Sequence, residues 1–255
     1  MAILKTIDSE TKLAQGRLEL IYLDDDLVAF NKPSGLLVHR SPIDRHETEF
    51  ALQKARDLIG QYVFPVHRLD KPTSGLLIFA LSQTAAKHLA EQFAANAIAK
   101  SYVAVVRGWP KSQFIDHPLK LTLDDRKGKT DRAIDAQSAQ TAVQVTATAE
   151  LPIVFDRYSA IRLARVALKP ETGRRHQLRR HLKHISHPII GDPKYGKGAL
   201  NRLLADELNI NRLMLHCASM SFGHPTTNQQ ITLRAQEPSV FEQLATQLPW
   251  KAVDL

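Results

Sequence analysis

Residues 67–77 read HRLDKPTSGLL and link two apolar, strand-like runs. Asp70 ends the first run, so we expect its carboxylate at the rim of a sheet. Arg68 and Lys71 lie beside it and favour its ionised form. A fixed carboxylate can serve as a nucleophile or a base, but Asp, Pro, Ser and Gly are also ordinary turn residues. The stretch alone therefore predicts two strands joined by a turn and leaves the chemistry of Asp70 open.

Hydrophobic patterning on both sides of this stretch predicts more strands than helices, and the two do not alternate regularly. Short turns between neighbouring strands favour antiparallel pairing. The expected strands cover 18–23, 27–31, 64–69, 76–81, 101–107, 142–149, 161–168, 188–190, 213–222 and 231–234. The expected helices cover 48–59, a segment capped by Ser82, the basic segment after 172–173, and 237–247.

These elements predict an α+β fold in which helices flank a large, mixed, mainly antiparallel sheet. We expect a single catalytic domain over residues 18–255, preceded by an N-terminal extension, residues 1–17. Residues 118–140 are polar and rich in Asp, Lys and Gln, which indicates an exposed excursion from that domain.

The composition of the 255 residues is that of a globular protein, with 44% hydrophobic and 24% charged residues. No apolar run approaches the roughly 20 residues of a membrane helix, and charges interrupt the N-terminus early. Cys217 is the one cysteine, which excludes an intrachain disulfide and multi-cysteine metal sites. We therefore expect a soluble cytoplasmic protein, and its net charge of +8 suggests a polyanionic partner.

The positive charge is concentrated between Arg157 and Lys183, where nine Lys or Arg residues accompany one acid, Glu171. Residues 172–184 read TGRRHQLRRHLKH, and apolar residues at i, i+4 and i+7 predict a helix there. Arginines at a helix N-terminus oppose the helix dipole unless an anion binds. The segment is thus either a nucleic-acid contact or a solvated basic face.

The sequence offers no motif for a metal or a cofactor. The histidines at 176, 181, 184 and 187 do not have a metal-binding spacing, and there is no HExxH, GxSxG, phosphate-binding lysine loop or GxGxxG after a strand. The sequence has no second carboxylate near Asp70, which a glycosidase would need. We expect neither a metal nor a cofactor.

Four segments in this order resemble the signatures of the RluA-type pseudouridine synthases, and the similarity spans residues 18–235. They are NKPSGLLVH at 31–39, HRLDKPTSGLL at 67–77, KSYVAVVRG at 100–108, and KPETGRRHQLRRHL at 169–182 followed by HPIIGD at 187–192. The resemblance implies an enzyme that isomerises uridine to pseudouridine within RNA. That reaction breaks the N1–C1′ bond, rotates the base and joins C5 to C1′, without a cofactor or a metal.

Many members of this family carry an N-terminal S4 RNA-binding domain, for which 17 residues are too few, so we expect none here. Residues 38–41, 66–75 and 174–182 are most similar to the branch that modifies uridine-65 in the T stem-loop region of tRNA. The expected partner is therefore tRNA, and we expect a monomer. The same chemistry on ribosomal RNA is the alternative, and a non-catalytic RNA-binding protein is a further one.

The resemblance assigns catalysis to Asp70, Tyr102 and Arg179. Asp70 either attacks C1′ or assists departure of the uracil, and a glycal route with loss of the C2′ proton is also open. Tyr102 would stack on the base and relay a proton, unless it is a core tyrosine. Arg179 would pair with Asp70, with Arg174 as the second choice.

The resemblance also points to residues that would contact the RNA. Arg68 matches the residue that fills the position of the flipped base, unless it forms a plain salt bridge, and His67 is either a contact or part of the motif's scaffold. The full set of expected RNA contacts is Arg68, His67, Asn31, Lys32, Arg174, Arg175 and Arg180.

Overall fold

The computed structural model describes residues 17–40, 46–120 and 135–253. Most of the expected N-terminal extension and the middle of the 118–140 excursion lie outside these ranges. The chain forms two compact units that are interleaved in sequence: Met1–Ile98 with Cys217–Gln236, and Ala99–His216 with Glu237–Leu255. The single catalytic domain over 18–255 remains a prediction.

The first unit is built on antiparallel strands. Its elements are β1 (Glu19–Leu23), β2 (Leu27–Lys32), β3 (Phe64–Pro65), β4 (Ser74–Ala80), β10 (Gln230–Arg234) and most of β9 (Leu215–Gly223), which begins in the second unit. β4 lies between β2 and β9, and all seven of its residues are buried. An apolar run without alternation is what a strand buried on both faces requires.

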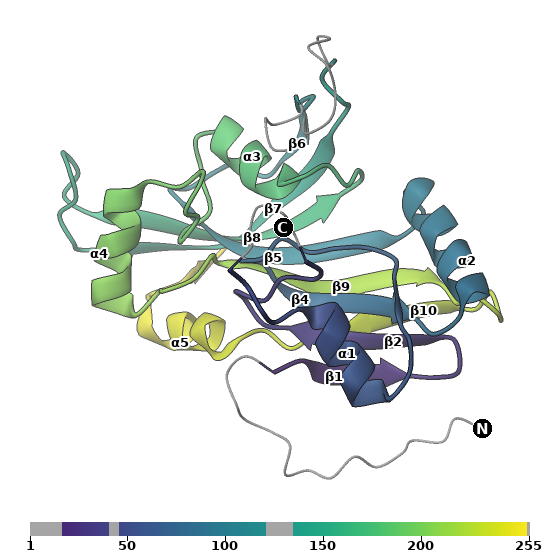
Figure 1. Ribbon diagram of the computed structural model, residues 1–255. Helices are drawn as coiled ribbons and strands as arrows, with labels where there is room; N and C mark the ends of the chain where they lie inside the picture. Colours follow the sequence, from purple (N-terminus) through teal and green to yellow (C-terminus); the bar gives the residue numbers. More distant parts are fainter. Residues whose placement is uncertain (1–16, 41–45, 121–134, 254–255) are drawn as a thin grey trace. The chain divides into compact units, whose positions relative to one another are not determined.

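Two helices belong to the first unit, α1 (Ala51–Ile59) and α2 (Gln83–Ala94). α1 contributes Ala51 and Ala55 to a core that includes Phe30 of β2 and Phe79 of β4, and it lies across these strands (Figure 1). The Ser82 hydroxyl accepts a hydrogen bond from the Ala85 amide, so the predicted cap of α2 is confirmed.

The second unit has its own antiparallel strands, with β8 paired to both β5 and β7. Its strands are β5 (Ala99–Arg107), β6 (Gln113–Asp116), β7 (Gln140–Leu151), β8 (Ile161–Pro170) and β11 (Lys251–Ala252). Its helices are α3 (Gln177–His184), α4 (Gly198–Leu208) and α5 (Ser239–Gln247).

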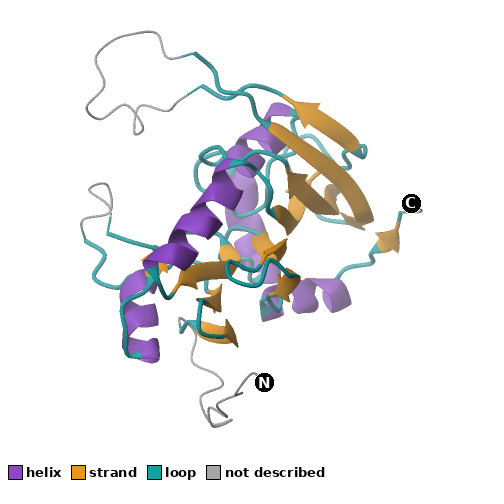
Figure 2. Ribbon diagram, turned by 90° about the vertical axis from the view of Figure 1, so that its right-hand side faces the viewer, coloured by secondary structure: helices purple, strands orange, loops and turns teal. Residues whose placement is uncertain are grey.

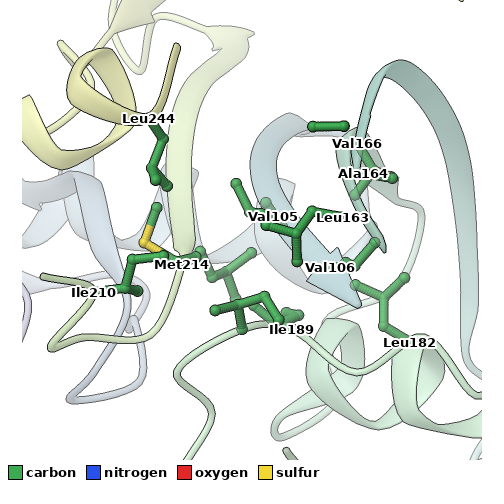
Figure 3. Packing of buried hydrophobic residues seen from close by; sticks show 14 of the residues in the cluster. Val105, Val106, Leu163, Ala164, Val166, Leu182, Ile189, Ile210, Met214 and Leu244 are labelled. Carbon is green, nitrogen blue, oxygen red and sulfur yellow. The ribbon is translucent and has the colours of Figure 1, made fainter. Parts of the chain in front are cut away.

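A continuous apolar core holds the second unit together. Figure 3 shows side chains from β5, β8 and α3 meeting those of the segment before β9 and of α5. Burial of apolar area on this scale is the main stabilising contribution in a domain of this size. The labelled residues of this core are Val105, Val106, Leu163, Ala164, Val166, Leu182, Ile189, Ile210, Met214 and Leu244.

The predicted combination of helices with a mainly antiparallel sheet is confirmed, and Figure 2 shows the two kinds of element in purple and orange. Some boundaries are wrong. The strand expected at 64–69 stops at Pro65, and 188–190 forms only a single bridge between Val106 and Ile189. α4, β6 and β11 were not predicted. Among the described residues, no helix is long and apolar enough to cross a bilayer.

Candidate active site

Asp70 lies in a loop of the first unit, between β3 and β4. The Asp70 carbonyl accepts a hydrogen bond from the Thr73 amide at 3.0 Å, which closes a turn immediately before β4. Asp70 itself is half-buried, whereas Leu69 before it and Thr73 after it are buried. The predicted turn between two apolar segments is therefore confirmed, and buried neighbours on both sides fix the backbone of Asp70.

The segment 32–36 holds the Asp70 loop by hydrogen bonds to the backbone carbonyls of that loop. The Gly35 amide donates to the Lys71 carbonyl at 2.8 Å, and the Ser34 hydroxyl donates to the Pro72 carbonyl at 2.7 Å. Gly35 has a φ of +89°, a conformation that side chains other than hydrogen disfavour. The first and second segments of the sequence resemblance are thus joined in space.

Lys32 does not lie where we expected an RNA contact. Its side chain has no exposed surface, and Nζ donates to the carbonyls of Pro33 at 2.9 Å, Leu36 at 2.8 Å and Lys71 at 3.3 Å. A buried ammonium needs such acceptors because it has lost its water. The predicted RNA contact by Lys32 is wrong, and the residue instead ties the 32–36 turn to the Asp70 loop.

Gly75, at the start of β4, is required by the neighbouring strand. A Cβ atom there would lie 2.2 Å from the Cys217 carbonyl oxygen, and its φ is +114°. Only a glycine allows the two backbones to approach so closely. The end of the Asp70 loop is therefore fixed against β9.

His67 has a structural role in the first unit. Its Nε2 accepts a hydrogen bond from the Ile78 amide at 2.9 Å, and its ring stacks on Phe93 of α2, with centroids 4.8 Å apart. An acceptor Nε2 carries no proton. This geometry supports the scaffold alternative, because the ring joins the loop to β4 and α2.

The other first-unit residues expected at RNA differ in exposure. Arg68 is exposed. Burial, together with the positive charge of Arg68, lowers the pKa of His39. Asn31 is half-buried, and its Nδ2 donates to the Gln236 carbonyl at 3.0 Å and to Glu19 at 3.3 Å. Arg68 is thus presented to solvent, while the Asn31 amide group is used within the protein.

Tyr102 belongs to the second unit, near the start of β5. It lies opposite Leu168 of β8, is half-buried, and packs partly against the core. One part of the side chain is thus in the core while another part reaches the surface. The placement is compatible with both alternatives given for Tyr102.

The predicted basic helix begins later than expected. α3 starts at Gln177, after His176 in a left-handed conformation with φ 54°, so Arg174 and Arg175 lie in the preceding loop. Arg174 is exposed and its Nε donates to the Ser138 carbonyl at 3.0 Å. Arg180 is half-buried and its Nη2 donates to the Lys120 carbonyl at 2.8 Å.

Gln177 fastens this basic loop to β7. Its Nε2 donates to the Gln140 carbonyl at 2.9 Å and to Thr141 Oγ1 at 3.0 Å. Its Oε1 accepts from Thr172 Oγ1 at 2.7 Å and from the Arg174 amide at 3.0 Å. Because the side chain is buried, these four bonds compensate its loss of hydration.

His181 continues the network. Its Nε2 lies 3.0 Å from the His117 carbonyl, which can only accept, so Nε2 carries the proton. Its Nδ1 then accepts from Thr141 Oγ1 at 3.0 Å. Burial lowers the pKa of His181, with the charges of His117, His184 and Arg180 acting in the same direction against the hydrogen bond to the His117 carbonyl. The histidine is thus held neutral as part of the fold.

Arg179 is buried and bound to Asp192. Nε donates to Oδ2 at 2.7 Å and Nη2 donates to Oδ1 at 2.8 Å, and both side chains are almost fully buried. Burial would raise the pKa of Asp192, but hydrogen bonding and the charge of Arg179 outweigh it and lower that pKa. Arg179 is therefore anchored within the second unit by Asp192, and its expected pairing with Asp70 stays a prediction.

In the described part of the chain, no group of three or more His, Cys, Asp or Glu side chains is arranged to hold a metal ion. His187 Nδ1 lies 2.7 Å from the Arg107 carbonyl, and His176 Nδ1 lies 3.0 Å from the Tyr195 hydroxyl. His184 stacks on His117 with centroids 3.7 Å apart. The histidines of the basic segment therefore contact protein groups.

A family model described as RNA pseudouridylate synthase matches residues 26–184. This chain belongs to the RNA pseudouridylate synthase family. It is therefore an isomerase by family, and the matched range contains Asp70, Tyr102 and Arg179.

Named relatives match nearly the whole chain. It is 47% identical over 238 residues to "tRNA pseudouridine synthase C" of Vibrio cholerae, covering 92% of this chain and 97% of that protein. It is 48% identical over 240 residues to the protein of the same name from Haemophilus influenzae, covering 92% of this chain and all of that one.

Solved structures of the pseudouridylate synthase family share the fold. "Human RNA Pseudouridylate Synthase Domain Containing 1" superposes with a TM-score of 0.69 at 23% identity, over 95% of this chain and 91% of the other. "Human RNA Pseudouridylate Synthase Domain Containing 4" gives 0.68 at 26% identity, over 91% and 94%. The α+β fold expected from the family resemblance is confirmed.

Asp192 lies in the segment HPIIGD, to which the sequence assigned no role. The role of Gln177 in anchoring the basic loop was not predicted either. No sequence pattern pairs the two residues, because Asp192 follows Arg179 by 13 positions. Burial of an arginine requires a partner, and Asp192 is the partner that the structure supplies.

Proposed function

We propose that this chain is a tRNA pseudouridine synthase, which isomerises a specific uridine of tRNA. The observation that carries the proposal is the near full-length identity of 47% with a protein named "tRNA pseudouridine synthase C". The presence of Asp70, Tyr102 and Arg179 in the matched range supports catalysis rather than RNA binding alone.

In this proposal Asp70 acts on the ribose. It attacks C1′ or assists departure of the uracil, and the N1–C1′ bond breaks. The base then rotates and C5 bonds to C1′, which releases Asp70 from C1′ if it had attacked there. C5 loses its proton and N1 gains one, so the atoms balance as an isomerisation. The turn at Asp70–Thr73 supports this role, because a carboxylate on a fixed backbone starts the reaction from a defined position. Tyr102 stacks on the uracil, and Arg179 orients the Asp70 carboxylate with its planar guanidinium.

The uridine must leave its stack before a carboxylate can reach C1′. In this proposal the Arg68 side chain fills the position that the flipped base leaves, since Arg68 is exposed on the loop that carries Asp70. Arg174, Arg175 and Arg180 contact the RNA backbone. Such contacts provide affinity that depends on salt, whereas the choice of uridine depends on the folded shape of the RNA.

The proposed target is uridine-65 in the T stem-loop region, modified by a monomer in the cytoplasm. The catalytic assignment is tested with Asp70→Asn and Asp70→Ala, for which we expect loss of pseudouridine formation while circular dichroism and tRNA binding stay close to wild type. Activity in either variant would remove Asp70 from the mechanism.

The target is tested by deleting the gene and mapping pseudouridines chemically across all tRNA and ribosomal RNA. We expect loss of a single tRNA site at position 65, and restoration by the wild-type gene but not by the Asp70→Asn gene. Loss of a ribosomal RNA site alone would contradict the tRNA assignment, and loss of a different tRNA site would contradict only the position.

A further inference from the structure

We propose that Asp192 is a positioning residue for catalysis, which holds the Arg179 guanidinium in the one orientation that the reaction uses. The inference rests on the proposed function for its catalytic part, and on geometry within the second unit for the rest. Neither the family match nor the named relatives assign a role to Asp192.

The contact between the two side chains fixes an orientation as well as a distance. Arg179 donates to separate oxygens of Asp192 through Nε at 2.7 Å and Nη2 at 2.8 Å. Two parallel bonds between planar groups hold both planes, which a single bond or a lysine ammonium cannot do. Water does not compete, because the exposed fractions of the side chains are 4% and 0%.

Asp192 is itself held by the backbone that follows it. Its Oδ1 also accepts from the Lys194 amide at 2.9 Å and the Tyr195 amide at 3.0 Å. Asn201 of α4 donates to the Asp192 carbonyl at 3.0 Å and accepts from the Gly191 amide at 3.0 Å. The carboxylate therefore has a fixed place in the fold, and Arg179 is aligned to it.

The face of the guanidinium is held as well as its edge. Cζ of Arg179 lies 5.1 Å from the centre of the Tyr195 ring, within the range of a cation–π contact. The Tyr195 hydroxyl lies 3.0 Å from His176 Nδ1, which anchors the ring to the loop before α3. The turn 192–195 thus contacts Arg179 along one edge and over one face.

This arrangement suits an arginine that serves a second carboxylate. A guanidinium has two edges with paired N–H groups, and Asp192 uses the Nε–Nη2 edge. The Nη1–Nη2 edge has the geometry that carboxylates accept. A pair that only stabilised the fold would affect stability but not the turnover of the folded enzyme, so turnover distinguishes the proposal from a purely structural role.

The direct test is Asp192→Asn, which is nearly isosteric. An asparagine keeps one oxygen for the Lys194 and Tyr195 amides, but turns an amide N–H toward Arg179 Nε–H and removes the negative charge. We expect kcat to fall about 100-fold, the effect of a misplaced catalytic group, with KM for tRNA unchanged. Assays are run where near-UV circular dichroism shows the variant to be folded.

Asp192→Glu guards against the case in which Asp192→Asn does not fold. It keeps the charge and can re-form the pair, but its extra methylene displaces the guanidinium. We expect kcat to fall by about 10-fold or more at wild-type KM. A purely structural pair predicts wild-type kcat for this variant. Glu150→Gln, which removes the exposed pair with Arg162, is the matched control and should leave kcat unchanged.

A double-mutant cycle shows whether Asp192 acts through Arg179. Arg179→Lys keeps a positive charge without the planar fork, so we expect Asp192→Asn to lower kcat by less than about 3-fold in that background. Additive losses, or unchanged kcat in both Asp192 variants, would overturn the role of Asp192 while the active wild type upholds the proposed function. An inactive wild type, assayed on total tRNA and ribosomal RNA, would overturn the proposed function and this inference with it.

Discussion

The loop that carries Asp70 in the first unit and the segment that carries Arg179 in the second are fixed by different means. The Asp70 loop is held through its own backbone carbonyls, as in the bonds from the Gly35 amide to the Lys71 carbonyl and from the Thr73 amide to the Asp70 carbonyl. The Arg179 segment is held by side chains, chiefly Gln177, His181 and Asp192.

The difference decides which substitutions each region tolerates. Backbone contacts survive most changes of side chain, so the first-unit loop depends on few identities, of which Lys32 and Gly75 are two. In the second unit each anchor is a polar side chain with several partners. Because a lost partner leaves another buried group unsatisfied, single substitutions there affect more than one bond.

The largest expected effect breaks the first-unit side of this comparison. Lys32→Met removes a buried side chain that bonds both loops, and the carbonyls of Pro33, Leu36 and Lys71 lose the hydrogen bonds from its ammonium. We expect a loss of about 3 kcal/mol in the free energy of unfolding, seen as a Tm lower by about 6 to 12 °C. Lys54→Met on α1, which loses only a partly exposed pair with Glu49, should change Tm little.

A smaller loss is expected from Gln177→Leu in the second unit. Leucine has a similar side-chain volume but makes none of the four hydrogen bonds of Gln177. We therefore expect the free energy of unfolding to fall by about 2 kcal/mol. Because the Arg174 amide is one of the partners, tRNA affinity should fall too. Gln113→Leu, at an exposed position with one bond to Lys111, is the control. An unaltered Tm for Gln177→Leu would contradict the anchoring role.

The pH dependence of stability sharpens the comparison further. Burial lowers the pKa of His181 below its value near 6.5 in an unfolded chain, so the unfolded state binds the proton more tightly. The contribution of neutral His181 to the free energy of unfolding is therefore complete above about pH 6.5. It falls as the pH drops below that value, by at most about 1.4 kcal/mol per pH unit.

We expect thermal unfolding of His181→Gln to start from a lower Tm at pH 7.5 and to depend less on pH between 7.5 and 5.5 than that of wild type. His88→Gln, an exposed change on α2, should keep the wild-type profile. A His181→Gln profile parallel to that of wild type would mean that other groups set the pH dependence.

The smallest expected effect concerns RNA affinity. Arg174→Ala should reduce the slope of log affinity for tRNA against log salt concentration by about 0.7 to 0.9, the value for one lost phosphate contact. Arg202→Ala on α4 is the matched control for removal of an exposed arginine. Lys32→Met should leave the slope unchanged, because a buried ammonium releases no counterions from the RNA; an altered slope would reopen the RNA role of Lys32.

Local features of the fold were predictable from sequence. The hairpin of β1 and β2 was predictable, because Asp24 is an ordinary turn residue between apolar runs. In the structure, Asp24 Oδ1 accepts hydrogen bonds from the amides of Asp26 and Leu27. α4 was not, because it starts at Lys197–Gly198 without a capping side chain. β6 and β11 are short and depend on pairing with β7, which the sequence does not display.

For the candidate site, the resemblance supplied Asp70, Tyr102 and Arg179, but not the contacts that hold them. Lys32 reads as a basic residue beside a turn, and its burial depends on three carbonyls that converge only in the fold. Arg179 and Asp192 are 13 positions apart, and no periodicity relates a helix residue to a turn after that helix. Long-range polar pairs of this kind require the structure.

The interleaving of the two units has a consequence for synthesis of the protein. β4 is buried throughout and has β9 as a neighbour, yet the chain of the second unit, residues 99–216, is made between them. At about 5 to 20 residues per second, those 118 residues take roughly 6 to 24 s. For that interval β4 can pair with β2, but its other neighbour, β9, does not yet exist. One side of an apolar strand is therefore left open, and we expect the yield of folded protein to depend on a chaperone that shields β4 at the ribosome.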